Sequence, residues 1–97
     1  MIRHVVMWRM KEDKKSEMEE MKKRLEALPG KIEQIRHLEV GINSKESPAA
    51  YDIVLISDFA NEEELQSYAK HPLHQEVVSF INQVTAERAV VDYERAD

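Results

Sequence analysis

The sequence contains no cysteine, and it has only two glycines and three prolines in 97 residues. The absence of cysteine excludes disulfides, thiolate metal sites and cysteine nucleophiles, and it is typical of a reducing compartment. Because the glycines stand apart at Gly30 and Gly41, no glycine-rich phosphate loop is present. Arg3, His4 and Arg9 interrupt the apolar N-terminal segment, which therefore predicts neither a signal sequence nor a membrane span. We expect a cytoplasmic protein.

Basic residues are in the minority. The chain has 14 lysines and arginines against 19 aspartates and glutamates, and its net charge of −5 argues against a nucleic-acid-binding function. We therefore expect no nucleic acid and no membrane as partners. A hydrophobic fraction of 42% and a charged fraction of 34% are those of an ordinary globular protein. A chain of this length without repeats or linkers predicts one domain, residues 1–97, with a thin core.

Four segments are typical of β-strands, because they are rich in β-branched and aromatic residues or alternate between apolar and polar positions: residues 2–10, 36–43, 51–59 and 86–94. Helical periodicity follows the first strand, with an apolar stripe at Met18, Met21, Leu25 and Leu28. Two further helices are predicted over residues 62–70 and 72–84.

The helix boundaries have recognisable signals. Ser16 or Asp13 is predicted to cap the first helix, and the Pro-Gly pair at residues 29–30 ends it. Asn61 precedes three glutamates, which favours a capped helix start because acidic groups interact well with the helix dipole. Pro72 suits the first turn of the third helix.

The order strand, helix, two strands, two helices, strand predicts a ferredoxin-like α+β fold built on a split β-α-β unit. The first and third strands are almost continuously apolar, which is typical of strands buried on both faces, so they belong in the centre of the sheet. We expect these two strands to run parallel through a right-handed crossover, with the second and fourth strands at the edges.

The two faces of the predicted sheet differ in what can cover them. Alternate residues of the first strand are expected to face the helices: Ile2, His4, Val6, Trp8 and Met10. The opposite face is expected to carry Val5, Met7, Val54, Ile56 and Val90. Because soluble proteins rarely expose such an apolar patch, we predict a homodimer in which sheet packs on sheet as a dimeric α+β barrel.

Three polar residues are predicted to meet between the sheet and the helices. His4 shares the parity of Val6, His74 lies on the first turn of the third helix, and Tyr68 lies on the preceding helix. Imidazole, imidazole and phenol in an apolar wall are typical of a small-molecule pocket. One neutral histidine could act as a general base, with the other two groups as donors to an enolate or oxyanion. Alternatively, both histidines are buried polar groups satisfied by hydrogen bonds.

Other site chemistry has weaker support. The pair His71 and His74 has metal-ligand spacing, but Pro72 removes the first of them from helical geometry and no third ligand is evident, so no metal site is predicted. No serine has the context of an acylating nucleophile. Tyr93 either closes the mouth of the pocket or pairs across strands.

Five stretches in this order carry a resemblance to a known family: IRHVVMWRMK, LPGKI with IRHLEVG, YDIVLISDF, YAKHPLHQEVV and VVDYE. Together they resemble the stress-responsive A/B barrel domain family over nearly the whole chain. The resemblance implies a dimeric α+β barrel whose protomers each hold a cavity between sheet and helices. One plant branch of the family consists of polyketide cyclases that catalyse an intramolecular aldol condensation. Its catalytic positions match His4, His74 and Tyr68.

The hypothesis favoured by the sequence is a homodimer that binds a small organic ligand near His4, Tyr68 and His74, without a cofactor. Trp8, His71 and Tyr93 are further candidate ligand-binding residues. The alternative is an enzyme of the cyclase, lyase or isomerase type, with His74 or His4 as general base. A third possibility is a structural or partner-binding module with a filled interior. A monooxygenase would need a haem or flavin site, for which the sequence gives no signal.

Overall fold

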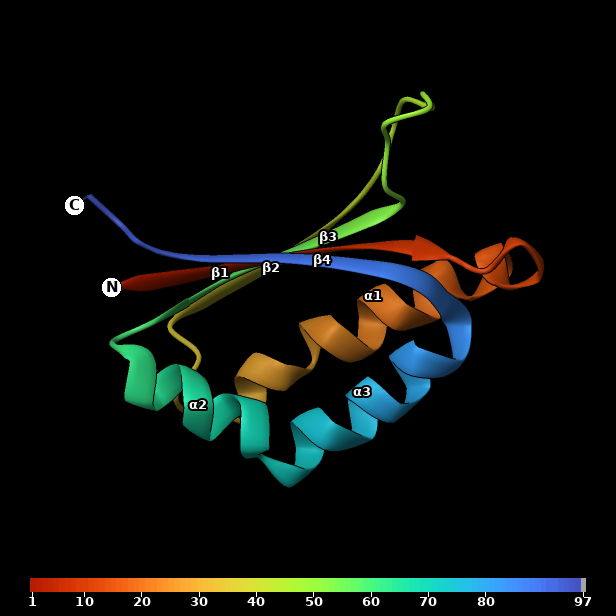
Figure 1. The fold of residues 1–97 in the computed structure, drawn as a ribbon. Helices are drawn as coiled ribbons and strands as arrows, with labels where there is room; N and C mark the ends of the chain where they lie inside the picture. The colour runs from red at the N-terminus through yellow and green to blue at the C-terminus, as the bar shows by residue number, and fades with distance from the viewer. Residues whose placement is uncertain (97) are drawn as a thin grey trace.

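In the computed structural model, which describes residues 1–96, a four-stranded sheet carries all of its helices on one face (Figure 1). The strands are β1 (Ile2–Met10), β2 (His37–Ile42), β3 (Ile53–Phe59) and β4 (Thr85–Glu94). The helices are α1 (Met18–Glu26), α2 (Glu62–Lys70) and α3 (Pro72–Val84), and short 3-10 helices cover Glu12–Glu17 and Leu28–Gly30. No helix in the described part of the chain is long and apolar enough to cross a membrane.

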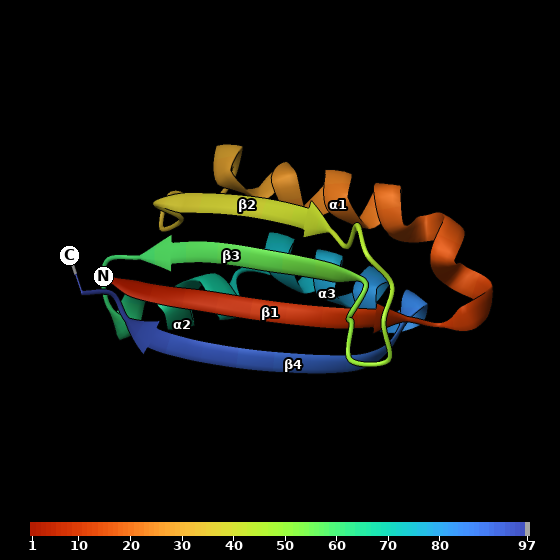
Figure 2. The same ribbon diagram turned by 90° about the horizontal axis from the view of Figure 1, so that it is seen from above.

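The strand order is β2-β3-β1-β4, so β1 and β3 occupy the centre as predicted (Figure 2). The predicted parallel arrangement of these two strands is wrong, because β1 pairs antiparallel with both β3 and β4. The helical connection after β1 leads to the far edge strand β2, and β3 then returns antiparallel between them. In a split β-α-β unit the two strands that the helix joins are not neighbours, and the strand inserted between them runs the opposite way.

The helix starts follow the sequence signals in part. The Asn61 side chain accepts a hydrogen bond from the backbone N–H of Glu64 at 2.9 Å and caps α2 as predicted. The capping role predicted for Ser16 or Asp13 is wrong, because both residues lie within the 3-10 helix that precedes α1 and no side chain caps either element. The tighter 3-10 turn satisfies the early backbone groups locally.

The core lies between the sheet and the helices. As predicted, alternate residues of β1 face it, and each is at most 9% exposed: Ile2, His4, Val6, Trp8 and Met10. They pack with buried residues of the helices and of the neighbouring strands, among them Met21, Leu25, Leu28, Leu55, Phe59, Tyr68 and Ile81. The layer is thin, so most of the chain's large apolar side chains are needed to fill it.

The opposite face of the sheet, here called the outer face, carries no helix from residues 1–96 (Figure 1). In the antiparallel register Val5 lies opposite Ile56 and Met7 opposite Val54, so these four residues share the outer face as predicted. The prediction for Val90 is wrong, because its cross-strand partner is Val6 and it therefore lies on the helix side. The loop between β2 and β3 rises from the outer face, away from the helices.

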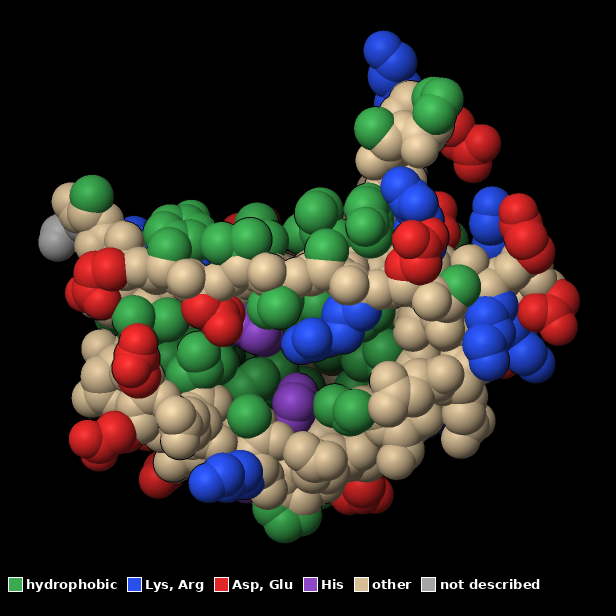
Figure 3. Space-filling model, in the orientation of Figure 1, with side chains coloured by type: hydrophobic (Ala, Val, Ile, Leu, Met, Phe, Trp, Pro, Cys, Tyr) green, Lys and Arg blue, Asp and Glu red, His purple; other side chains and the backbone are tan. Residues whose placement is uncertain are grey.

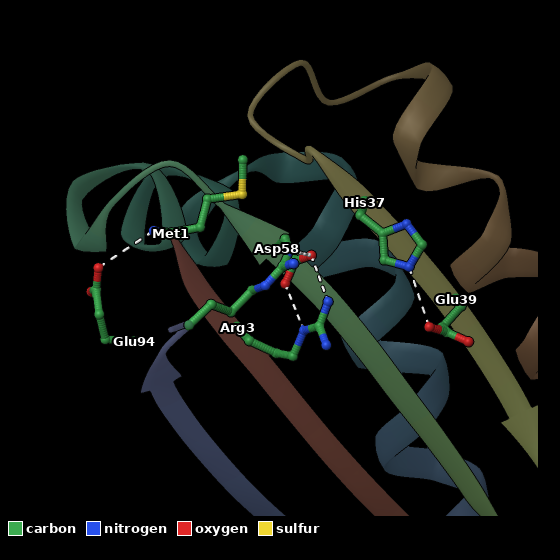
Figure 4. Close-up of polar contacts among 7 residues, drawn as sticks. Met1, Arg3, His37, Glu39, Asp58 and Glu94 are labelled. Atoms are coloured by element: carbon green, nitrogen blue, oxygen red, sulfur yellow. Dashed lines mark hydrogen bonds and ion pairs between the residues drawn. The ribbon is translucent and has the colours of Figure 1, made fainter. Parts of the chain in front are cut away.

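One end of the outer face holds a buried ion cluster (Figure 4). Asp58 has a side chain only 1% exposed; Arg3 donates two hydrogen bonds to it, at 2.8 and 2.9 Å, and Arg95 donates a third at 2.8 Å. The hydrogen bonds from Arg3 hold the pKa of the Asp58 carboxyl below its usual range. His37 and Glu39 form an exposed contact nearby on β2. The cluster ties the centre of the sheet to the C-terminal segment.

Candidate functional site

A cavity of about 280 Å³ lies between the sheet and helices α2 and α3. The space-filling view shows the hollow between these layers, with histidine and hydrophobic surfaces inside it (Figure 3). Its apolar wall includes Val6, Trp8, Leu25, Leu55, Leu65, Val78 and Ile81, and its polar lining consists of His4, Tyr68, His74, Gln75, Asn82 and Arg88. Side chains therefore do not fill the whole space between the sheet and the helices.

The cavity brings together the three residues that the sequence analysis selected. Tyr68 lies in the middle: its ring centre is 4.2 Å from that of His74 and 6.3 Å from that of His4. Each residue comes from a different element, β1, α2 or α3, and all three line the cavity. The alternation of β1 and the helical spacing across the α2–α3 junction produce this convergence.

His4 is oriented by a carboxylate from the neighbouring strand. Its Nδ1 lies 2.5 Å from Oδ1 of Asp92, and the two residues are direct cross-strand partners of β1 and β4. With Asp92 ionised, Nδ1–H is the donor, and Nε2 is left for a ligand. Asp92 was not among the residues predicted for the site. The sequence shows that Asp92 lies on the last predicted strand, but only the register between β1 and β4 places it opposite His4.

Tyr68 is 1% exposed, and its hydroxyl has no hydrogen-bond partner among the described residues. Burial raises the pKa of the Tyr68 phenol well above its usual value, so the hydroxyl stays protonated at neutral pH. Because buried polar groups are almost always paired in folded proteins, this hydroxyl is an unused donor on a residue that lines the cavity. An acceptor atom of a ligand would satisfy it.

His74 is held in one tautomer. Its Nδ1 lies 3.1 Å from the carbonyl oxygen of Ala69, so Nδ1–H donates and Nε2 carries the lone pair of the neutral ring. Burial lowers the pKa of the His74 imidazole, and the Ala69 hydrogen bond opposes this shift only in part. At neutral pH the ring is therefore uncharged and Nε2 is an acceptor, which is the state that a general base requires.

Of the other three predicted ligand-binding residues, one lines the cavity and two do not. Trp8 lines the cavity and is 4% exposed. His71 does not line it, because its Nδ1 accepts the backbone N–H of Leu73 at 3.1 Å and caps α3. Tyr93 lies on the outer face, as the cross-strand partner of Arg3, so the predicted role at the cavity mouth is wrong for this residue. Local capping geometry and the register of β4 decide these two cases.

No group of three potential metal ligands from histidine, aspartate or glutamate occurs in residues 1–96. His71 and His74 are each engaged at Nδ1 by the backbone of the α2–α3 junction. The polar side chains that line the cavity carry imidazole, phenol, amide and guanidinium groups.

Comparison with known proteins identifies both a matching family and similar folds. The model of the Stress responsive A/B Barrel Domain family matches residues 2–95. A dimeric protein of unknown function with a ferredoxin-like fold from Bacteroides fragilis is 35% identical; the match covers 97% of this chain and 95% of that one, with a TM-score of 0.85.

Two further proteins are similar along most of their length. A dimeric ferredoxin-like protein of unknown function from Thermobifida fusca is 24% identical, with coverage of 95% and 88% and a TM-score of 0.85. An uncharacterized protein of Streptomyces coelicolor is 31% identical over 97% of this chain and 99% of its own length. The predicted ferredoxin-like α+β fold is confirmed by the two structural matches.

Proposed function

We propose a ligand-binding function for this chain, which belongs to the Stress responsive A/B Barrel Domain family. The chain forms one domain and acts as a homodimer, and each protomer holds one small organic molecule in the cavity between sheet and helices. His4, Tyr68 and His74 provide the polar contacts, and Trp8 is part of the apolar wall. The cavity volume of 280 Å³ lies just below the range of about 300–1,000 Å³ typical of ligand pockets, so the ligand is small.

The observation that carries this proposal is the unpaired hydroxyl of Tyr68. A buried hydroxyl without a partner costs about 1–3 kcal/mol, and a purely structural core would avoid that cost with phenylalanine. A ligand with a carbonyl or similar acceptor would satisfy the hydroxyl and recover this energy. The neighbouring Nε2 of His74 is a second unused polar position on the same wall.

The state of His74 favours a second candidate function, an enzyme of the cyclase, lyase or isomerase type. A neutral imidazole with a free Nε2 can remove a proton from the carbon next to a carbonyl group. The Tyr68 hydroxyl would then donate to the enolate oxygen, together with the Nε2–H of a His4 imidazolium whose Nδ1–H is held by Asp92. In this proposal His74 is the base, and His4 and Tyr68 are catalytic donors.

The homodimer is proposed from the outer face of the sheet. Met7 is 38% exposed, Val91 62% and Tyr93 46%, and these residues lie on one continuous surface with Val5 and Ile56. A second copy of this chain is the occupant we propose, because the Bacteroides fragilis relative at 35% identity is dimeric. Sheet-on-sheet packing would cover the apolar side chains and leave the cavities on the outside of the dimer.

The ligand-binding proposal is tested by the fluorescence of Trp8, the only tryptophan of the chain. Small aromatic and carbonyl compounds are titrated into the wild type, His4→Ala and His74→Ala, with His37→Ala as a control because His37 is exposed on the other face. We expect saturable quenching in the wild type and the control, and an affinity at least about tenfold lower in the two cavity variants. A panel that binds no variant, or binds all equally, contradicts the proposal.

The enzyme candidate has a separate test. Aryl methyl ketones that bind are incubated with the protein in D₂O, and exchange of the methyl protons is followed by NMR. An active base accelerates the exchange in the wild type and in His37→Ala but not in His74→Ala. Binding without accelerated exchange refutes the enzyme candidate and leaves ligand binding intact.

A further inference from the structure

We infer that the cavity selects a carboxylate-bearing ligand, with Arg88 of β4 as the residue that holds the carboxylate. The inference rests on the proposed ligand-binding function and names the class of ligand. Arg88 is the cross-strand partner of Trp8, so it lies on the helix side of the sheet. It lines the cavity and is exposed at the edge strand, which places its guanidinium at the mouth.

The charge around the cavity is the first argument. The chain has a net charge of −5 and 19 acidic residues, yet no aspartate or glutamate within residues 1–96 lines the cavity. The nearest carboxylate on the same face of β4 is Asp92, and His4 engages it. The guanidinium of Arg88 is therefore the one uncompensated charge among the described lining residues.

The second argument is the contrast with the other arginines. Arg3 and Arg95 hold Asp58, Arg9 holds Glu87, and Arg24 holds Glu20. Arg88 makes no ion pair or hydrogen bond with any residue in the described part of the chain, although the surface is rich in acids. Arg36 likewise forms no ion pair with a described residue, but it lies just before β2 and does not line the cavity.

The third argument is the buried end of the site. Tyr68, which lines the same cavity, is 1% exposed, and its hydroxyl is a donor without a partner among the described residues. A ligand that reaches from Arg88 to Tyr68 passes the apolar side chains of Val6, Trp8 and Val78. The matching molecule is a small acid with an apolar body, a carboxylate at one end and a hydrogen-bond acceptor at the other.

A carboxylate fits this arrangement better than a phosphate. A guanidinium binds a carboxylate through two parallel hydrogen bonds, and one arginine is sufficient for a single negative charge. Phosphate sites commonly add backbone N–H groups of glycine-rich loops or helix starts. Among the described residues, the lining contains no glycine, and its residues from the start of α3 are His74 and Gln75; the backbone N–H of Gln75 already bonds to the carbonyl of His71.

The inference is tested with matched pairs of ligands that differ only in charge. Aryl-substituted carboxylic acids, their primary amides and the corresponding phosphate monoesters are titrated against the wild type, Arg88→Gln and Arg88→Lys, using Trp8 fluorescence and thermal shift. Arg36→Gln is the control that removes the same charge elsewhere. We expect the wild type to bind the acid about tenfold to a hundredfold more tightly than the amide.

The variants distinguish selection of a carboxylate by Arg88 from ligand binding in the cavity as such. Arg88→Gln should remove the preference for the acid while leaving the affinity for the amide unchanged, Arg88→Lys should restore part of it, and Arg36→Gln should keep it. Equal binding of acid and amide by the wild type, a preference that survives in Arg88→Gln, or tighter binding of the phosphate overturns the inference but leaves ligand binding in place. Binding of no member of any pair overturns the proposed function itself.

Discussion

Replacing Tyr68 by phenylalanine should stabilise the ligand-free protein. The tyrosine ring packs between Phe59 and His74, at ring-centre distances of 4.8 and 4.2 Å, and phenylalanine keeps both contacts. The substitution removes only a hydroxyl that is buried and has no partner among the described residues. Relief of that desolvation penalty should raise the free energy of unfolding by about 1–3 kcal/mol.

The size of the effect makes it measurable by two methods. In a domain of this length, each kcal/mol raises the melting temperature by about 4–8 °C, so calorimetry should show a clear increase. Urea denaturation should give a higher midpoint with an unchanged slope. Tyr51→Phe is the matched control, because Tyr51 is only half-buried at the start of β3, and its loss should change stability by less than about 0.5 kcal/mol.

The stability advantage of Tyr68→Phe over the wild type should disappear when ligand is present. A ligand that accepts the Tyr68 hydroxyl stabilises the wild type more than Tyr68→Phe, so the difference in melting temperature should shrink or reverse. A Tyr68→Phe protein that is less stable than the wild type without ligand would show that the hydroxyl is satisfied in the folded chain. That result would refute the central observation behind the proposed function.

Three other measurements test the charges and the outer face. Because burial lowers the pKa of His74, the unfolded chain takes up its proton first as the pH falls. The wild type should therefore lose stability relative to His74→Gln when the pH drops below about 6.5 in urea titrations, and a constant difference would contradict this. Asp58→Ala should lower the free energy of unfolding by about 2 kcal/mol at pH 7 in urea denaturation, because Arg3 and Arg95 lose their shared partner. An unchanged free energy of unfolding would show that the cluster does not stabilise the fold. Met7→Glu should weaken the dimer about a thousandfold in sedimentation experiments, since each dimer buries two new carboxylates at roughly 2 kcal/mol each. Gln66→Glu adds the same charge on α2 and should leave the dimer intact, and a dimeric Met7→Glu protein would exclude the outer face as the interface.

The amino-acid sequence alone was sufficient to predict the helices and strands and the residues of β1 that face the helices. Strict alternation placed His4 with Val6 and Trp8 toward the helices, and all three are buried there. Asn61 and Pro72 marked helix starts because capping and proline effects depend on neighbouring residues. These features are local in the chain, so one sequence carries enough information to predict them.

Tertiary structure decided the features that depend on distant pairing. His4 and Asp92 are 88 positions apart, and only the β1–β4 register brings them into contact. A change of register by one residue exchanges the two faces of a strand, which is why Val90 was placed on the wrong face. The same register puts Arg88 beside Trp8 and Tyr93 on the outer face. Alternation along a strand means that neighbouring side chains point to opposite faces of the sheet. Long-range pairing determines which of them point toward the helices, and therefore which side chains line the cavity.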